Sequence, residues 1–497
     1  MLEMLGQGLM LATQWQVLLF LLLGVVVGII VGSLPGLTST MGVALLLPLT
    51  FAMEAATGIL FLIGVYFGSM YGGSITAILI NTPGSPAAAA TVLDGYPMTR
   101  KGEAYKALQI STLCSSIGGF ISVLVLILVA PQLAAFALRF SAPETFALAL
   151  FGLSIISTLS SGSMVKGLIS GFAGLLLATI GLDPISGITR FSGDSLHLLG
   201  GISFIAVMIG LFAMSEVFRM MEGSNAVRAA TGQMVKTVKD KAGLSWKEFK
   251  SLIVTLLRST GIGTGIGMIP GAGADVAAFV AYNEAKRFDK DPESFGKGSL
   301  KGVAAPEAAN NSLTGGAMVP LLTLGIPGDA VTAVLLGALL VQGLQPGPML
   351  FENNGPLVYT LFIGMLLANV LIFVIGWSCI RLFTRILSVP IGLMIPVILV
   401  LCVVGAYALN NQFFDVIVMF LAGMLGYAMK RYDFPVAPLV LGMILGPMME
   451  SNLRRALIMS QGSLEIFYTR PVTAVLLLLA LATLLSPLFK WLRTRRR

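Results

Sequence analysis

The chain has 497 residues, of which 56% are hydrophobic and 11% are charged. This composition excludes a water-soluble globular protein, because the apolar surface exceeds what a soluble core can bury. The formal net charge of +8 would suit nucleic-acid binding, but the basic residues lie where they would orient a membrane protein, so we expect a lipid bilayer and no nucleic acid among the partners.

Apolar runs of about the 20 residues that cross a bilayer as a helix recur along the chain. The first run is preceded by Glu3 and by no Lys or Arg, so it lacks the basic region of a cleavable signal peptide, and we expect it to be retained. The sequence therefore predicts an all-α polytopic membrane protein.

The first half of the chain contains two apolar segments that a Pro-Gly pair interrupts, at 15–53 and 57–93, followed by a polar loop at 94–106. A proline inside a membrane helix removes a backbone hydrogen bond and clashes with the preceding turn. We therefore expect a re-entrant hairpin at 15–53 and a broken helix at 57–93. Four uninterrupted spans follow, near 107–131, 143–161, 164–182 and 196–219.

The second half repeats this plan, with matching Pro-Gly positions at Pro270 and Pro327. Its segments are an interrupted pair at 249–285, a polar loop at 286–302, a second interrupted segment at 303–343, and spans near 357–380, 388–409, 412–429 and 434–449. The predicted organisation is a first transmembrane repeat at 1–218, a cytoplasmic connector at 219–248, a second repeat at 249–461, and an extra C-terminal span with a basic tail at 462–497.

Lys and Arg residues predict the orientation, because short cytoplasmic loops are enriched in them. Most of them lie on one side when the loop 94–106, the connector and the C-terminal tail are cytoplasmic. The first repeat then crosses five times, so the repeats have inverted topology and their hairpins and broken helices meet near the midplane. Arg454 and Arg455 are left outside; a re-entrant 434–461 would bring them inside but would expel the Arg-rich tail.

Unwound backbone within a membrane is tolerated only where protein or water satisfies its polar groups, so the Pro-Gly breaks predict a lined cavity. Each break creates a helix N-terminus whose free amides and positive dipole end favour an anion such as a carboxylate. An interhelical loop, a plain kink or a packing contact is the alternative for each break. The candidate substrate-binding residues are Pro35, Gly36, Leu37, Thr38, Ser39, Pro83, Gly84, Ser85, Pro270, Gly271, Ala272, Gly273, Asn310 and Asn311.

Two carboxylates lie just after breaks in the second half, at Asp275 and Asp329. Both would repel an anion unless they bind a cation, so they are candidates, with Thr40, for binding a coupling Na+ or H+. A helix N-cap is an equally good interpretation of each, because capping Asp is favoured at this position. Glu307 shares one helix face with Asn310 and Asn311, and this face lines the substrate path or marks an interfacial helix start.

Several blocks resemble the large membrane subunit of the tripartite tricarboxylate transporter family, the TctA type, over nearly the whole chain. These blocks are Gly-Ser-Leu-Pro-Gly-Leu from 32, Tyr-Gly-Gly-Ser-Ile-Thr-Ala-Ile-Leu-Ile-Asn-Thr-Pro-Gly from 71, Gly-Met-Ile-Pro-Gly-Ala-Gly-Ala-Asp from 267, Ala-Pro-Glu-Ala-Ala-Asn-Asn-Ser from 305 and Pro-Leu-Val-Leu-Gly-Met-Ile-Leu-Gly-Pro from 438.

The resemblance implies secondary active uptake of a tricarboxylate or related carboxylate, with citrate as the leading candidate, driven by an Na+ or H+ gradient. It also implies a small partner membrane subunit, a periplasmic substrate-binding protein and a place in the bacterial inner membrane. The distribution of Lys and Arg predicts that the C-terminus lies in the cytoplasm. We expect no cofactor or bound metal other than a coupling Na+.

Two other classes of function stay open. An intramembrane enzyme would use Asp275 and Asp329 as a carboxylate pair that shares a proton, and a substrate-cleavage assay with each Asp changed to Asn would detect it. A passive organic-anion channel would show uptake that does not depend on an ion gradient. An ATP-driven pump is disfavoured, because the chain has no Gly-x-x-x-x-Gly-Lys-Ser/Thr sequence. We expect a transporter subunit that is not an enzyme.

If the breaks form the site, replacing Gly36 or Gly271 with a bulky residue should abolish substrate-dependent uptake and leave the protein in the membrane, because a side chain would block the close approach of the backbone to the ligand. Uptake kinetics measured beside membrane abundance test this expectation, and unchanged kinetics in both variants would contradict it.

Overall fold

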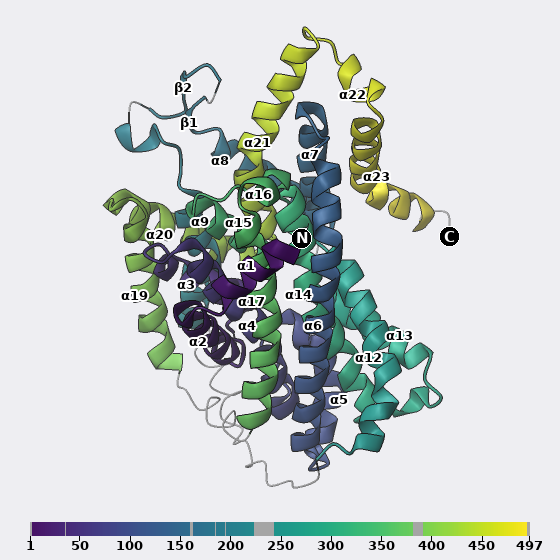
Figure 1. Cartoon of the computed structure of the whole chain (residues 1–497). Helices are drawn as coiled ribbons and strands as arrows, with labels where there is room; N and C mark the ends of the chain where they lie inside the picture. Colours follow the sequence, from purple (N-terminus) through teal and green to yellow (C-terminus); the bar gives the residue numbers. More distant parts are fainter. Residues whose placement is uncertain are drawn as a thin grey trace. The chain divides into compact units, whose positions relative to one another are not determined.

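The computed structural model describes residues 2–34, 36–159, 163–183, 185–193, 195–222, 243–380 and 391–494. The chain forms two compact units, and Figure 1 shows that almost all of its elements are helices. Unit 1 comprises Met1–Ala134 and Glu216–Leu401, and unit 2 comprises Ala135–Ser215 and Cys402–Arg497. Each unit therefore takes segments from both halves of the sequence.

Unit 1 contains all four Pro-Gly breaks. Its helices from the first half are α1 (Leu2–Ala12), α2 (Trp15–Gly32), α3 (Ser39–Leu46), η1 (Leu47–Thr50), α4 (Ala55–Ile80), η2 (Pro86–Ala88), α5 (Ala89–Arg100) and most of α6 (Ala104–Ala137). Its later helices are α10 (Ser215–Glu222), α12 (Trp246–Gly267), α13 (Ala274–Arg287), η5 (Pro292–Ser294), α14 (Leu300–Leu324), α15 (Ala330–Val341), α16 (Pro348–Asn353), α17 (Gly355–Ser378) and the first half of α19 (Ile391–Asn410).

Six helical segments within the described residues are long and apolar enough to cross a membrane, by length and composition. They are Trp15–Gly32, Ala55–Ile80, Ala104–Ala137, Phe204–Glu222, Gly355–Ser378 and Phe413–Arg431. These spans confirm the prediction of a helical multi-pass membrane protein, with shorter apolar helices between them.

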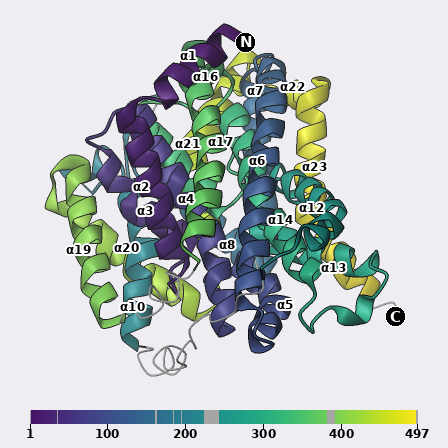
Figure 2. The ribbon, with the colours of Figure 1, turned by 60° about the horizontal axis from the view of Figure 1, so that its bottom comes forward.

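Helices α2 and α4 lie side by side in Figures 1 and 2, and glycines set their separation. A Cβ on Gly28 of α2 would lie 2.4 Å from the carbonyl oxygen of Val65, and a Cβ on Gly68 of α4 would lie 2.5 Å from that of Val25. Small residues allow this approach of two backbones, which is how membrane helices gain packing energy without a hydrophobic driving force. Every residue from Ala56 to Ile80 is buried, so α4 is a central helix of unit 1.

Corresponding helices of the second half, α12 and α14, pack in the same way. A Cβ on Gly267 of α12 would lie 2.6 Å from the carbonyl oxygen of Leu313, and one on Gly316 of α14 would lie 2.4 Å from that of Thr264. The helices also end in the same way: the residue that caps the C-terminus, Asn81 for α4 and Gly325 for α14, has a left-handed backbone conformation. These parallels agree with an internal repeat, and the inversion of one repeat relative to the other stays a prediction.

A buried carboxylate on α5 holds the polar loop that precedes α14. The Asp94 side chain is 0% exposed, and it accepts hydrogen bonds from the backbone amides of Gly296, Gly298 and Ser299 and from the Tyr282 hydroxyl. Asp94 is not among the residues that the sequence predicts as functional. This carboxylate ties the 296–299 backbone to α5 and so determines where α14 begins.

Unit 2 is a helical body with one small hairpin. Its elements are α7 (Ala142–Leu159), α8 (Met164–Ala178), β1 (Gly181–Leu182), β2 (Thr189–Arg190), η3 (Leu196–Leu198), α9 (Phe204–Ile209), the π-helical turn η4 (Gly210–Met214), α20 (Phe413–Arg431), α21 (Ala437–Met459), α22 (Glu465–Thr469) and α23 (Pro471–Thr494), with the end of α19. The two strands pair antiparallel, with Gly181 opposite Arg190.

An ion-pair network joins this hairpin to α21. Arg190 Nη1 lies 2.6 Å from Glu450 Oε1, and Arg454 Nη1 lies 2.7 Å from Asp183 Oδ2. The backbone amides of Ser186 and Ile185, together with the Arg454 guanidinium, hold the pKa of the Asp183 carboxyl below its usual range.

Ion pairs and hydrogen bonds also join residues that the charge pattern predicts on the same side of the membrane. Arg190 and Arg454, both predicted outside, share Glu450. The Lys166 ammonium, predicted inside, donates to the Tyr432 carbonyl oxygen, which directly follows the predicted inside pair Lys430–Arg431. These pairings agree with the topology that leaves Arg454 outside. The orientation of the whole chain and the domain boundaries stay predictions.

We predict that Gly28→Ala lowers the free energy of unfolding by about 1–3 kcal/mol, because the added methyl group meets the Val65 carbonyl. Gly261→Ala in α12 is the matched control, since a Cβ there meets nothing within 4 Å, and alanine is the better helix former by about 1 kcal/mol. Thermal unfolding of both variants in detergent measures the difference. Equal losses of stability in the two variants would contradict the close packing of α2 on α4.

Candidate functional site

All four breaks border one cavity of about 150 Å³ in unit 1. This volume is below the roughly 300–1,000 Å³ of typical ligand pockets, so the cavity suits a compact ion or one end of a larger one. Each break contributes three consecutive residues, and α4 contributes Met70. The lining residues are Thr38, Ser39, Thr40, Met70, Ser85, Pro86, Ala87, Gly273, Ala274, Asp275, Asp329, Ala330 and Val331.

Hydroxyl groups come to the cavity from the first two breaks. Thr38 is the N-cap of α3, and its hydroxyl accepts a hydrogen bond from the Met41 amide. The Ser39 hydroxyl lies 3.5 Å from the Met70 sulfur. Ser85 is only 6% exposed, and its hydroxyl has no hydrogen-bond partner among the described residues. A buried hydroxyl without a partner costs free energy unless a ligand or water completes it, so Ser85 is available to bind one.

The third break presents an uncapped helix N-terminus. Gly273 is the N-cap of α13, with φ 68° and ψ 152°, a region that only glycine adopts readily. It supplies no side-chain cap for the first turn, so the amides that begin α13 are available to an anion. The Asp275 carboxylate follows in that turn, and within the described residues it makes no hydrogen bond or ion pair.

The fourth break carries a carboxylate that is fully engaged. Asp329 is the N-cap of α15, and its Oδ1 accepts hydrogen bonds of 2.7 Å from both the amide and the hydroxyl of Thr332. Its Oδ2 accepts a hydrogen bond of 2.7 Å from the buried hydroxyl of Tyr66 on α4. The helix-cap interpretation therefore holds for Asp329, whereas the Asp275 carboxylate does not act as an N-cap. The binding of a coupling cation by either carboxylate stays a prediction.

The cavity brings two carboxylates together, and its lining includes no Lys, Arg or His. An anionic ligand would meet helix N-termini and hydroxyls but also negative charge, so a bound cation would strengthen its binding. No group of three His, Cys, Asp or Glu side chains in the described part of the chain could hold a metal ion. A monovalent cation would instead use Asp275 with the hydroxyl and backbone oxygens of the cavity.

Several predicted substrate residues lie beside the cavity and not on its surface. The Gly84 amide donates to the Gly73 carbonyl, and the Gly271 amide donates to the Gly328 carbonyl at 2.7 Å. The glycines of these pairs therefore join backbone segments. Pro35 lies outside the described residues. The other predicted residues that do not line the cavity are Gly36, Leu37, Pro83, Pro270, Ala272, Asn310 and Asn311.

Residues that the sequence analysis missed complete the lining. Pro86, Ala87, Ala274, Ala330 and Val331 are small or apolar and follow directly on the predicted residues, so their place after a break was the available signal. Met70 lies in the middle of α4 and had no such signal, because only the packing of α3 against α4 brings it to the cavity.

The polar face of α14 is fully buried, with Glu307 and Asn310 each 0% exposed. Neither side chain lies on the surface of the protein, and both interpretations of this face stay predictions. The Asn310 side-chain amide donates to the Met70 carbonyl at 3.4 Å, and its Oδ1 has no partner in the described part of the chain. Asn310 thus lies directly behind a residue that lines the cavity.

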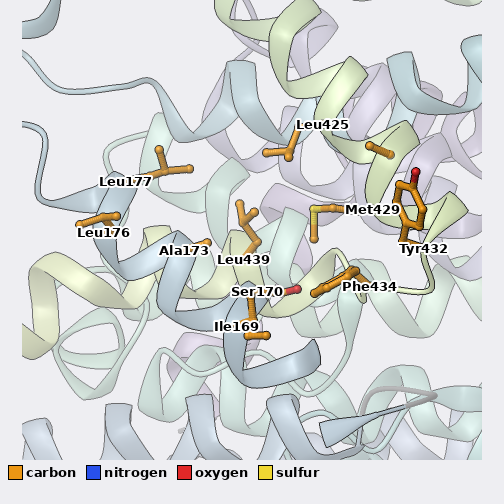
Figure 3. Close-up of a pocket in the computed structure, with 11 residues that line it drawn as sticks. Ile169, Ser170, Ala173, Leu176, Leu177, Leu425, Met429, Tyr432, Phe434 and Leu439 are labelled. Carbon is orange, nitrogen blue, oxygen red and sulfur yellow. The ribbon is translucent and has the colours of Figure 1, made fainter. Parts of the chain in front are cut away.

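A larger cavity of about 440 Å³ lies in unit 2 and differs in chemistry (Figure 3). Its lining comes from α8, α20 and the start of α21 and is almost entirely apolar. Ser170 contributes a hydroxyl that, like that of Ser85, is buried without a partner among the described residues. This cavity has no charged lining residue, so it is a poor site for a carboxylate.

Comparison with known proteins gives a match to the model of the tripartite tricarboxylate transporter TctA family over residues 18–441. The chain is 38% identical over 473 residues to a protein of Agrobacterium vitis described as an uncharacterized 52.8 kDa protein in the TAR-I ttuC′ 3′ region, covering 95% of this chain and 93% of that protein. It is also 38% identical over 234 residues to a protein in the TAR-II ttuC′ 3′ region of the same organism, covering 47% of this chain and 97% of that one. No solved structure matches.

Asp329→Ala should lower the free energy of unfolding by roughly 2–4 kcal/mol, because it removes a helix cap and leaves the Tyr66 hydroxyl unpaired. Asp275→Ala is the matched variant and should change stability by no more than about 0.5 kcal/mol, since its carboxylate has no partner to lose. Unfolding of both variants in detergent checks this. A loss at Asp275 as large as that at Asp329 would show that Asp275 is structural.

Proposed function

Because the chain belongs to the tripartite tricarboxylate transporter TctA family, we propose that it is the large membrane subunit of a secondary active transporter. The transporter takes up a tricarboxylate or a related carboxylate and couples this uptake to an Na+ or H+ gradient. The protein lies in the bacterial inner membrane with its C-terminus in the cytoplasm. A small membrane subunit and a periplasmic substrate-binding protein complete the complex, in keeping with the family's tripartite description.

The observation that supports this proposal is the meeting of all four breaks at one cavity. Broken helices whose ends converge on one site supply amides for a carboxylate and oxygens for a cation, and substrate and ion sites of secondary transporters are built in this way. The uncapped N-terminus of α13 and the unpartnered hydroxyl of Ser85 are the groups available to the substrate.

Ion coupling follows from the charges in the cavity. The carboxylates of Asp275 and Asp329 repel an anion, and a cation that binds beside them offsets this repulsion. Substrate and cation then bind better together than alone. This mutual dependence is the thermodynamic requirement of symport.

The two alternative functions, an intramembrane enzyme and a passive channel, fit the cavity less well. An intramembrane enzyme needs two carboxyl groups that can share a proton, but both oxygens of Asp329 already accept hydrogen bonds from Thr332 and Tyr66. A passive channel needs no cation beside the substrate. Symport is therefore the function that the cavity supports best.

The test is uptake by proteoliposomes that contain this chain with its small membrane subunit and binding protein, with imposed Na+ or H+ gradients and a panel that includes citrate and dicarboxylates. We expect accumulation above the outside concentration that depends on the gradient and on the binding protein. Equilibration without accumulation would indicate a channel, and conversion of the substrate would indicate an enzyme.

Ser85→Ala should weaken substrate binding about five- to tenfold, which corresponds to the loss of one hydrogen bond of roughly 1 kcal/mol. Its stability should not fall, because the hydroxyl has no protein partner to lose. Ser170→Ala is the matched control, since it removes an equally buried and unpartnered hydroxyl from the apolar cavity. Equal uptake kinetics in the two variants would exclude the Ser85 hydroxyl from the substrate site.

A further inference from the structure

Glu307 is a buried acid that the cavity does not use. It lies in the first third of α14 and is 0% exposed. Its carboxylate accepts hydrogen bonds from the hydroxyls of Thr91 on α5 and of Ser111 and Ser115 on α6. The buried Ser74 hydroxyl of α4 lies beside it without a well-aligned hydrogen bond. Hydroxyls from three neighbouring helices thus converge on one carboxyl group.

No cationic side chain pairs with Glu307 in the part of the chain that the structure describes. An ionised carboxylate in apolar surroundings without a counter-ion is costly, and such a group is neutralised most readily by a proton. Tyr71 of α4 and Cys114 of α6 are the titratable neighbours close enough to interact with it electrostatically, and neither carries a positive charge.

Charged groups on the other helices that pack against α14 form no ion pair with Glu307 in the described residues; on α13, for example, Arg287 pairs with Glu284. On α5, Asp94 bonds to Tyr282 of α13 and to the loop before α14. On α12, the Arg258 guanidinium stacks over the Phe288 ring at 4.4 Å. Glu352 of α16 is exposed, and Asp329 before α15 bonds to Tyr66. A proton is therefore the charge that can compensate Glu307.

The geometry favours a proton over a metal cation. The Ser111 and Ser115 oxygens lie 2.7 and 2.9 Å from Glu307 Oε2, which are hydrogen-bond distances. Oxygens that coordinate one ion of the size of Na+ or Ca2+ lie about 2.3–2.6 Å from the ion. Such oxygens are therefore further from one another than the oxygens of a hydrogen bond. The hydroxyls are therefore spaced for hydrogen bonds to the carboxyl group and not for the coordination of such an ion.

Two short connections join Glu307 to the cavity. Asn310 lies on the same face of α14, three residues further on, and its side-chain amide donates to the carbonyl of Met70, which lines the cavity. Thr91 lies on α5, which follows directly on the cavity residues Pro86 and Ala87 of η2. A change in the charge of Glu307 therefore acts on two elements that shape the cavity.

We propose that Glu307 is the proton-binding site of this transporter, and that it takes up one proton with the carboxylate substrate and releases it on the other side of the membrane. This inference rests on the proposed transport function. In the cycle, the carboxylate becomes a carboxylic acid and returns to a carboxylate, so one H+ crosses with each substrate. Because Glu307 is fully buried, the proton enters and leaves only when the helices around it move, which links proton transfer to the conformational change.

The direct test is infrared spectroscopy of the reconstituted full chain during a pH titration. The wild-type protein should show the carbonyl band of a protonated carboxylic acid that disappears as the pH rises, is absent from Glu307→Gln, and does not change when K+ replaces Na+. Ser111→Ala combined with Ser115→Ala should move the midpoint to higher pH by roughly one unit, because two donors to the carboxylate are lost.

The second test is a transport assay of the reconstituted complex with radiolabelled citrate as the probe. In Glu307→Gln, the stimulation of citrate uptake by an inward proton gradient should fall at least tenfold, while citrate–citrate exchange should persist. Glu307→Asp, which keeps a carboxyl group, should restore part of the stimulation. Ser170→Ala is the control and should keep both activities.

Proton-driven accumulation that persists in a folded Glu307→Gln protein would overturn this inference and leave the transport function intact. The inference would also be overturned if the carboxylic-acid band of the wild-type protein did not change with pH, or if Na+ removed that band. If the wild-type complex transports no carboxylate, the transport function fails, and the infrared titration, which needs no substrate, still decides whether Glu307 binds a proton.

Discussion

Satisfying the backbone at the four breaks is the constraint on which the rest of unit 1 depends. An amide or carbonyl group that leaves a helix inside an apolar environment must find a new partner. The Gly271 amide finds the Gly328 carbonyl, and the Gly84 amide finds the Gly73 carbonyl. Glycine permits the close approach at the second break, because a Cβ on Gly84 would clash with the Gly32 carbonyl oxygen and with the Gly73 backbone. The cavity is the space that remains among the segments joined in this way.

Negative charge in the centre of unit 1 is balanced in a different way at each carboxylate. Asp94 accepts backbone amides and holds a loop, and Asp329 caps a helix and bonds to Tyr66. Glu307 has only hydroxyl donors, and Asp275 has no partner in the described residues. Asp94 and Asp329 accept backbone amides and so hold the fold in place, whereas Asp275, which has no described partner, and Glu307, which accepts only from hydroxyl groups, are the acids proposed to bind a cation and a proton. This division separates the structural acids from those proposed to act in transport.

Helix α14 connects these features. Its N-terminus follows the loop that Asp94 holds, its first half carries Glu307 and Asn310, and its C-terminus leads at Gly325 into the fourth break. Its packing on α12 depends on Gly267 and Gly316. A buried helix that carries the proposed proton site and leads into a break that borders the cavity can couple proton uptake to the shape of the cavity without a long chain of intermediates.

Much of this organisation could be predicted from the sequence, because composition and the local chemistry of proline and glycine act at short range. Apolar runs predicted membrane helices, and Pro-Gly pairs predicted the breaks and the capping position of Asp329. The sequence could not predict that Gly84 and Gly271 join backbone segments while Ser85 and Gly273 face the cavity, since this depends on which helices approach one another. The burial of Glu307 among Thr91, Ser111 and Ser115 likewise joins helices about 200 residues apart. Hydropathy reports how apolar a segment is, but only tertiary packing determines which polar groups meet inside it.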